Sequence, residues 1–154
     1  MNLRDHLFAA IDETLDKMAF MSFSAAADAA VAADAAAAAS PFAYTVRLGF
    51  RGKVTGELTL YFTEKTAVAM SRNLLGLRDG DELFPGTKED ALKEFANILM
   101  GRSLSLLDPS TPFTLQIPEA RPGNIQAAPP SADSLEIRGM FDDYEPCRLV
   151  IGYR

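Results

Sequence analysis

Residues 44–62, YTVRLGFRGKVTGELTLYF, decide the fold that we predict for this chain. Apolar residues alternate with other residues on both sides of Arg51-Gly52, which is the pattern of two β-strands with one buried face. A short connection containing glycine joins such strands as an antiparallel hairpin. The alternating apolar residues are Tyr44, Val46, Leu48 and Phe50 in the first strand and Val54, Leu58, Leu60 and Phe62 in the second.

Two helices are predicted after the hairpin. The first covers residues 64–75, with Thr63 as a suitable N-cap and Gly76 as a typical stop. The second is a central helix over residues 88–106, which ends before Pro109 because proline cannot continue a helix. A polar loop connects the two helices.

The rest of the chain predicts three further strands. A short strand over residues 113–117 meets Pro118, where we expect a structural turn that leads into a proline-rich loop. Residues 135–141 and 148–153 form two closing strands. Strands that follow one another without intervening helices pair antiparallel. We therefore predict an α+β fold, in which long helices pack against one face of an antiparallel β-sheet.

A single domain over residues 1–154 is expected, because 48% of the residues are hydrophobic and can form one core. Residues 1–23 predict an amino-terminal amphipathic helix. The alanine-rich residues 24–41 form either a helical extension or a linker. We favour the helix, because alanine is the strongest helix former. Residues 42–154 then carry the sheet and the central helix.

Composition excludes several partners and compartments. The net charge of −6 argues against binding to nucleic acid, which needs a basic surface. Asp12, Glu13 and Asp16 interrupt any secretory apolar segment, and no apolar stretch of about 18 residues could insert into a membrane. The single cysteine fits a reducing compartment, so we expect a cytoplasmic protein.

Few side chains could carry catalysis on their own. His6 is the only histidine, so a histidine-rich metal site is excluded, and we expect His6 on a helix surface. Cys147 lies in a predicted strand and is expected to be a small buried residue, not a reactive thiol. No glycine-rich phosphate-binding loop follows a strand. We predict no metal site and no cofactor bound by the chain itself.

The central helix carries the one unusual polar surface. Asp90, Glu94, Asn97 and Gly101 lie within about 60° of one another on its circumference. Leu92, Phe95 and Leu99 point to the other side and would dock the helix on the core. The outward stripe therefore presents two carboxylates, a carboxamide and a residue without a side chain to a second macromolecule.

Two simpler interpretations of this stripe stay open at this point. Thr87 and Asp90 have the spacing of a capping box, in which Asp90 would stabilise the start of the helix. Glu94 and Asn97 could belong to a solvated helix face without a function. Asparagine inside a helix costs about 0.5 kcal/mol relative to alanine, which mildly favours a reason for its presence.

The order of these elements resembles the CheC/CheX family of bacterial chemotaxis phosphatases over roughly residues 43–153. The family motif is Asp or Ser, three residues, Glu, two residues and Asn, which corresponds here to Asp90, Glu94 and Asn97. The glycine that closes the helix in the family corresponds to Gly101. The family proline falls near Ala120. The segments that accompany the motif are Gly56–Leu60, Leu74-Leu75-Gly76 and Leu115–Pro118, and Pro118 and Pro122 bracket Ala120.

The resemblance implies hydrolysis of the aspartyl phosphate on a CheY-like response regulator. In this role, Asn97 orients the attacking water and Glu94 clamps a lysine of the partner. Asp90 and Gly101 contact the partner. The receiver domain of the regulator supplies Mg²⁺. The alternative is a non-catalytic module that binds a response regulator or acts as a flagellar-switch-like interaction domain. An intact pair of Glu94 and Asn97 favours the phosphatase.

The resemblance also bears on the number of sites and on assembly. Two-site members carry a second motif on the first helix, where the register here is Ala9, Glu13 and Asp16. Aspartate in place of asparagine loses the NH₂ donor and adds a charge that repels phosphate, so we expect one site, as in CheX. One-site members pair through their sheets. We therefore expect a homodimer, with an exposed edge strand such as residues 135–141 supplying the contact.

Overall fold

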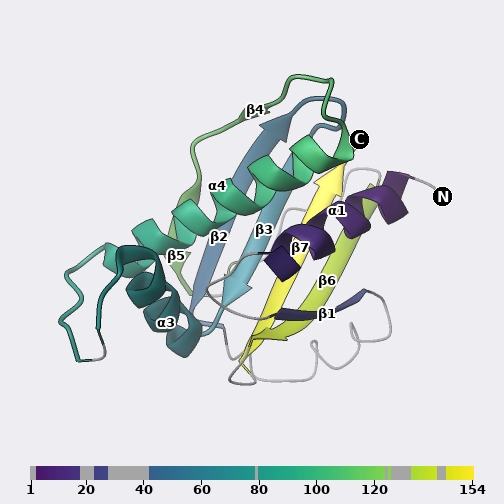
Figure 1. Cartoon of the computed structure of the whole chain (residues 1–154). Coiled ribbons are helices and arrows are strands. Elements are labelled where there is room, and N and C mark those ends of the chain that lie inside the picture. Colours follow the sequence, from purple (N-terminus) through teal and green to yellow (C-terminus); the bar gives the residue numbers. More distant parts are fainter. Residues whose placement is uncertain are drawn as a thin grey trace.

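One antiparallel sheet with helices on a single face organises the molecule (Figure 1). The computed structural model describes residues 3–17, 23–27, 42–78, 80–123, 125, 133–141 and 145–154. The helices are α1 (Leu3–Lys17), α3 (Glu64–Leu75) and α4 (Thr87–Leu107). The strands are β1 (Phe23–Ala27), β2 (Tyr44–Arg51), β3 (Gly56–Phe62), β4 (Thr114–Leu115), β5 (Glu119–Pro122), β6 (Asp133–Phe141) and β7 (Pro146–Tyr153).

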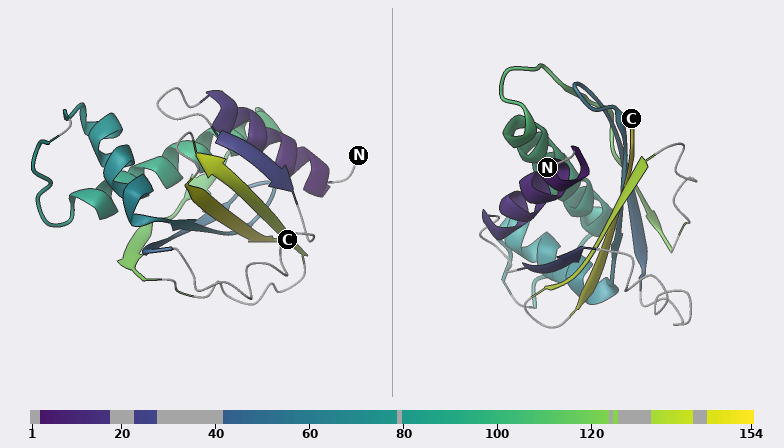
Figure 2. Two further views of the ribbon diagram at one scale, coloured as in Figure 1. Left: turned by 90° about the horizontal axis from the view of Figure 1, so that it is seen from below. Right: turned by 90° about the vertical axis from the view of Figure 1, so that its right-hand side faces the viewer.

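The described strands follow the spatial order β1-β6-β7-β3-β2-β4, and β5 also pairs with β2. Every pairing is antiparallel. The side and bottom views show the helices stacked on one side of the sheet (Figure 2). The predicted α+β class is therefore confirmed, and so is the hairpin of β2 and β3, which runs from the pair Tyr44–Phe62 to the pair Phe50–Gly56.

The core lies between the sheet and the helices. Leu58, Leu60 and Phe62 of β3 are at most 1% exposed on the face that the helices cover. Helix α4 packs on this face, and the Phe95 ring meets the Phe62 ring edge to face with 5.6 Å between their centroids. Leu7 and Ile11 dock α1 beside α4. This burial holds α4 in place and fixes which of its sides faces outward.

The opposite face of the sheet carries charged side chains. The Glu136 carboxylate accepts hydrogen bonds from Arg148 Nε at 2.6 Å and Arg138 Nε at 2.9 Å. Arg148 also stacks on the Tyr61 ring, with 5.0 Å between its guanidinium carbon and the ring centroid. Burial raises the pKa of Glu136, but the two arginines outweigh it, so its pKa lies below the usual value. No helix among the described residues covers this face.

The amino-terminal segment differs from the prediction. Helix α1 ends at Lys17 within the described residues, and residues 23–27 form strand β1 where we predicted helix or linker. The register of β1 on β6 runs from Phe23–Phe141 to Ala27–Ile137. Pairing with a distant strand satisfies the backbone groups of both, and this tertiary gain overrides the helix propensity of alanine. Residues 28–41 of the alanine-rich stretch lie outside the described residues.

The same pairing corrects the expected edge strand. Residues 137–141 of β6 bond to β1 on one side and residues 133–140 bond to β7 on the other. That part of β6 is therefore not free to pair with a second copy of the chain. The contact that we expected from residues 135–141 is available only where β1 does not reach.

The proline-containing segment after α4 also forms more sheet than predicted. The strand expected over residues 113–117 is only the two-residue β4, and β5 occupies residues placed in the predicted loop. Pro118 lies in the break between them. Both strands pair with the outer edge of β2, where Pro122 is tolerated because an edge strand does not need every N–H.

The ends of α3 agree with the prediction. The Thr63 side chain accepts a hydrogen bond from the Thr66 N–H, and Gly76 ends the helix with φ 66°. Helix α4 begins at Thr87 and ends before Asp108, within one residue of the expected bounds. None of the described helices is long and apolar enough to cross a membrane.

Two neighbouring glycines give a matched test of how closely β3 and β7 approach. An added Cβ at Gly56 would stand 2.0 Å from the Gly152 carbonyl oxygen, whereas one at Gly152 would meet nothing within 4 Å. We expect Gly56→Ala to lower the free energy of unfolding by roughly 2–3 kcal/mol, because backbone must move. Gly152→Ala should be neutral or slightly stabilising. Urea unfolding measures both, and equal effects would contradict this packing.

Candidate functional site

The outward stripe of α4 is present as predicted. Leu92, Phe95 and Leu99 are at most 2% exposed, so the opposite side of the helix faces away from the core. Asp90 and Glu94 are exposed on that side. Asn97 and Gly101 are half-buried farther along the same helix. Helical geometry thus brings all four predicted residues to one surface.

Asp90 does not cap the helix. The N-cap is Gly86 with φ 84°, and it contributes no side-chain hydrogen bond, so the capping box expected of Thr87 and Asp90 is absent. The positive φ of Gly86 turns the chain into the helix one residue earlier than the sequence pattern suggests. The Asp90 carboxylate instead lies 3.2 Å from Lys93 Nζ and its side chain is 77% exposed. Asp90 is therefore accessible to a partner.

A basic residue ties the start of α4 to the rest of the fold. Lys88 Nζ donates a hydrogen bond to the Glu64 carboxylate of α3 at 2.5 Å, and it lies 5.6 Å from the centre of the Tyr44 ring on β2. The hydrogen bonds to Glu64 and Tyr44 raise the pKa of Lys88 to about 12. The ammonium stays charged at neutral pH and holds the first turn of α4 against two other elements.

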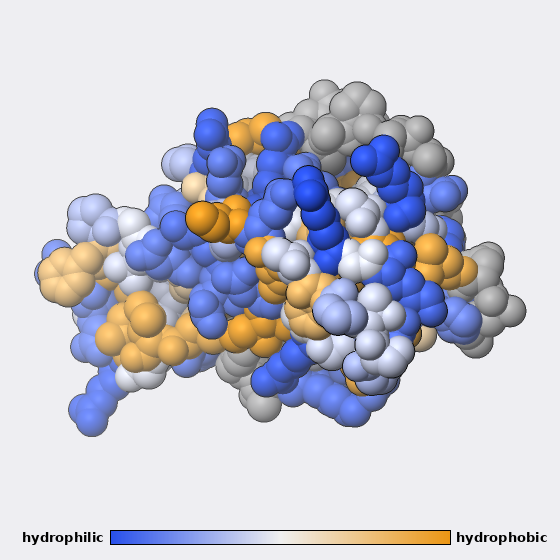
Figure 3. Space-filling view, turned by 90° about the horizontal axis from the view of Figure 1, so that it is seen from above, coloured by the Kyte–Doolittle hydropathy of each residue, from blue (hydrophilic) through white to orange (hydrophobic). Residues whose placement is uncertain are grey.

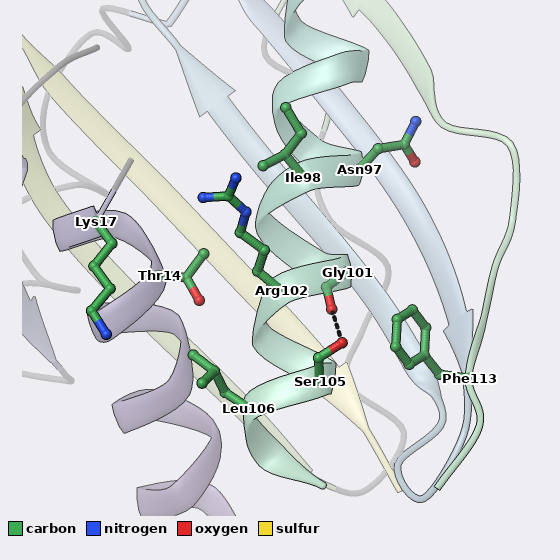
Figure 4. Close-up of a pocket in the computed structure, with 9 residues that line it drawn as sticks. All are labelled: Thr14, Lys17, Asn97, Ile98, Gly101, Arg102, Ser105, Leu106 and Phe113. Carbon is green, nitrogen blue, oxygen red and sulfur yellow. Dashed lines mark hydrogen bonds between the residues drawn. The ribbon is translucent and has the colours of Figure 1, made fainter. Parts of the chain in front are cut away.

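A groove of about 570 Å³ lies between α1 and α4 and includes part of the predicted site. Figure 4 shows Asn97 on the side of Phe113, whereas Ile98 and Arg102 point toward α1. Gly101 lies at the centre of the lining and Ser105 donates a hydrogen bond to its carbonyl at 2.9 Å. The lining residues are Thr14, Lys17, Asn97, Ile98, Gly101, Arg102, Ser105, Leu106 and Phe113.

The resemblance implied that Gly101 closes the helix. It does not, because α4 continues to Leu107. A Cβ added at Gly101 would meet only Leu115 Cδ1 at 3.8 Å, which is ordinary van der Waals distance. Packing within the described chain therefore does not require glycine here. A glycine in mid-helix costs about 1 kcal/mol relative to alanine, so its presence indicates a need outside the fold itself.

Buried hydroxyl groups join α1 to α4 beneath the groove. Thr14 Oγ1 donates to the Ala10 carbonyl at 2.8 Å, and Ser103 Oγ lies within hydrogen-bond distance of Thr14 Oγ1 at 3.3 Å. Both side chains are at most 2% exposed. Since buried hydroxyls that lose a partner cost free energy, this contact favours one relative position of the two helices.

The first helix offers no second complete motif among the side chains described. Glu13 Oε1 lies 2.5 Å from Lys17 Nζ, four residues farther along α1. That ion pair occupies the carboxylate at the register position corresponding to Glu94. Asp16 lies in α1, but its side chain is outside the described part, so the expectation of a single site stays a prediction.

Other chemistry is sparse in the described part of the chain. No cluster of histidine, cysteine and acidic residues there could hold a metal ion. His6 is exposed on α1, as expected. Cys147 is buried, and burial raises the pKa of its thiol to about 12, so the thiol stays protonated at neutral pH. The stripe on α4 and the adjoining groove remain the candidate site.

Of the residues that line the groove, sequence patterns alone predicted only Asn97 and Gly101. Arg102 and Leu106 face α1, and Phe113 approaches from the segment after α4, so their proximity depends on tertiary packing. The helical period of α4 could have placed Arg102 on the flank of the stripe, near Ile98. Nothing local in the sequence indicates that α1 supplies Thr14 and Lys17 to the same surface.

Comparison with known proteins relates this fold and motif to one protein family. Residues 44–135 match the model of the family described as chemotaxis phosphatase CheX, a match that includes Asp90, Glu94, Asn97 and Gly101. No curated protein sequence matches the chain. Solved structures share the fold of this chain at low sequence identity.

Solved structures of CheX proteins share the fold over their full length. The chemotaxis protein CheX from Desulfovibrio desulfuricans has a TM-score of 0.70 at 15% identity, with 100% of each chain covered. CheX of Borrelia burgdorferi, solved in a complex with CheY, BeF₃ and Mg²⁺, has a TM-score of 0.71 at 17% identity, covering 99% of this chain and 98% of that chain. Thermotoga maritima FliY is more distant, with a TM-score of 0.57 at 13% identity, covering 97% and 86%.

The family match spans more than half of the chain, and it begins at the first residue of β2 and ends in β6. It therefore contains the hairpin, both later helices and the outward stripe on which the sequence resemblance was based. By this match and by its fold, the chain belongs to the CheX family of chemotaxis phosphatases.

Proposed function

We propose that this protein hydrolyses the aspartyl phosphate of a CheY-like response regulator at the outward face of α4. The observation that carries the proposal is that the side chains of Glu94 and Asn97 are exposed or half-buried and have no hydrogen-bond or ion-pair partner in the described part of the chain. The two residues lie one helical turn apart at the surface. An unengaged carboxylate and carboxamide at this spacing are free to contact a partner.

Asn97 supplies the group that orients water. Its side-chain carbonyl can accept a hydrogen bond from the attacking water, while its NH₂ group can donate to a phosphoryl oxygen. The amide is neutral, so it does not repel the phosphoryl group as a carboxylate would. Phosphoryl transfer to water depends on positioning and on charge stabilisation more than on a covalent nucleophile, so one placed amide is a sufficient contribution.

Glu94 fixes the position of the partner. A carboxylate one turn before Asn97 can form an ion pair with a lysine of the receiver domain and set the docking register. Asp90 lies another turn back and extends the acidic surface. Mg²⁺ comes with the receiver domain in this proposal. This chain itself contributes the polar side chains of Asn97, Glu94 and Asp90 to the reaction.

The comparisons support this assignment at the level of the family. The CheX of Borrelia burgdorferi forms a complex with CheY in the presence of BeF₃ and Mg²⁺. Beryllium fluoride is a chemical mimic of a phosphoryl group, so a complex that contains it favours a phosphorylated partner. The shared fold and the family motif favour the same partner class for this chain.

The alternative is binding to a response regulator without turnover. The fold is shared with FliY at a TM-score of 0.57, so the architecture alone does not require a phosphatase. Retention of both Glu94 and Asn97 favours hydrolysis, because a module that only binds does not need an amide aimed at a phosphoryl group. The following experiment separates the two functions.

Asn97→Ala should lower the maximal rate of receiver dephosphorylation by about 100-fold, because the water is no longer oriented. Glu94→Ala should raise the half-saturating receiver concentration by about tenfold through loss of the ion pair. The measurement follows phosphoaspartate on a CheY-like receiver from the same cell, labelled with acetyl phosphate in the presence of Mg²⁺.

Glu119→Ala is a matched control, because Glu119 is an exposed acid on β5 that is opposite Arg47 of β2 and lies 3.7 Å from Arg121, not on the outward stripe of α4. It should leave both kinetic constants unchanged. Tight receiver binding without accelerated loss of phosphate in the unmodified protein would establish the binding module instead. Full turnover by Asn97→Ala would overturn the role of this residue.

Gly101→Ala separates stability from function. Alanine fits the space at this position and has the higher helix propensity, so the free energy of unfolding should rise by up to about 1 kcal/mol. Dephosphorylation should nevertheless slow by roughly tenfold, since the new methyl group stands where the partner approaches. Urea unfolding and the phosphoaspartate assay give the two values. Unchanged turnover in a stabilised variant would remove Gly101 from the interface.

A further inference from the structure

The groove between α1 and α4 is continuous with the site at Asn97. The residues of α4 that line it run from Asn97 to Leu106 and span about 14 Å along the helix axis. A typical stable interface covers about 800 Å² on each partner, which corresponds to a patch of about 16 Å radius. A patch of this size centred on Asn97 would therefore also cover the groove. Under the proposed function, the protein that lies against the groove is the CheY-like receiver.

The acidic residues of the outward stripe and the basic residues of the groove lie on opposite sides of Asn97. Asp90 and Glu94 lie on the amino-terminal side, whereas the charged residues that line the groove are Lys17 and Arg102. This is a basic rim on a chain whose net charge is −6. Lys17 is already paired with Glu13, with side chains 65% and 48% exposed. Arg102 is exposed and makes no ion pair with any described residue.

The floor and walls of the groove are mostly apolar. Ile98 and Phe113 are half-buried on its sides, and Leu106 is 46% exposed at its end. The space-filling view from above shows hydrophobic surface broken into small patches between hydrophilic side chains (Figure 3). Small apolar contacts of this kind give little affinity alone, so the charged rim has to supply direction and selectivity.

We propose, on the basis of the proposed function, that the groove receives an acidic segment of the CheY-like receiver and that Arg102 determines this specificity. A guanidinium group can bind a carboxylate through two parallel hydrogen bonds, and it is unengaged here. The receiver then docks in one orientation, with a basic residue opposite Glu94 and an acidic residue opposite Arg102. Gly101 between them lets the receiver backbone lie close to α4.

The test measures binding and turnover separately. Arg102→Glu and Arg102→Gln are exposed helix substitutions that should leave the fold intact. Binding is measured with the receiver loaded with BeF₃ and Mg²⁺, and turnover with the phosphorylated receiver. Arg102→Glu should raise the dissociation constant and the half-saturating concentration at least tenfold, with Arg102→Gln in between. The rate at saturation should stay within twofold, because Asn97 is unchanged.

Arg121→Glu is the matched control. It makes the same charge change at an exposed residue of β5. Arg121 is opposite Thr45 of β2, on the sheet face turned away from the helices, and it forms an exposed ion pair with Glu119 at 3.7 Å. It should change neither constant by more than twofold. An equal effect of Arg121→Glu would show that net charge alone steers the receiver and would overturn the role of Arg102.

The remaining outcomes distinguish this proposal from the proposed function. Unchanged binding by Arg102→Glu, together with lost turnover in Asn97→Ala, would overturn the groove assignment and leave the phosphatase standing. Weakened binding by Arg102→Glu in a protein that shows no turnover would support the groove and overturn the phosphatase. A dimer that dissociates in Arg102→Glu, with receiver binding unchanged, would assign the groove to a second copy and overturn the proposal.

Discussion

The packing of α4 on the β2–β3 hairpin is the constraint on which the rest of this structure depends. Leu92, Phe95 and Leu99 have one buried surface to dock on, and the edge-to-face contact of Phe95 with Phe62 sets the rotation of the helix. Once that rotation is set, Glu94 and Asn97 must face outward. The chemistry of the site is thus a consequence of core packing on the other side of the same helix.

The functional site divides its chemistry between two proteins in our proposal. This chain contributes a neutral amide, a carboxylate and a guanidinium, all carried by one helix whose first turn is held by two other elements. The metal ion and the reactive bond belong to the receiver. The requirement on this chain is placement.

Local patterns predicted what local forces determine. The alternation in β2 and β3, the caps of α3 at Thr63 and Gly76, and the two sides of α4 follow from residue periodicity and capping. Strands β1 and β5 were missed because their partners, β6 and β2, lie far away in sequence. The groove could not be predicted, because it exists only where α1 packs on α4.

The strand order has a consequence for how the protein folds. Strand β3 pairs with β7, and β1 pairs with β6. Neither pairing can form before β6 and β7, the last strands of the chain, have been synthesised. Until then, the hairpin of β2 and β3 has an unsatisfied inner edge. Closing loops of this length is slow, because chain entropy is lost before the contacts form. We therefore expect the nascent chain to complete its sheet only after synthesis of β7, and to depend on cellular protection of that edge before then.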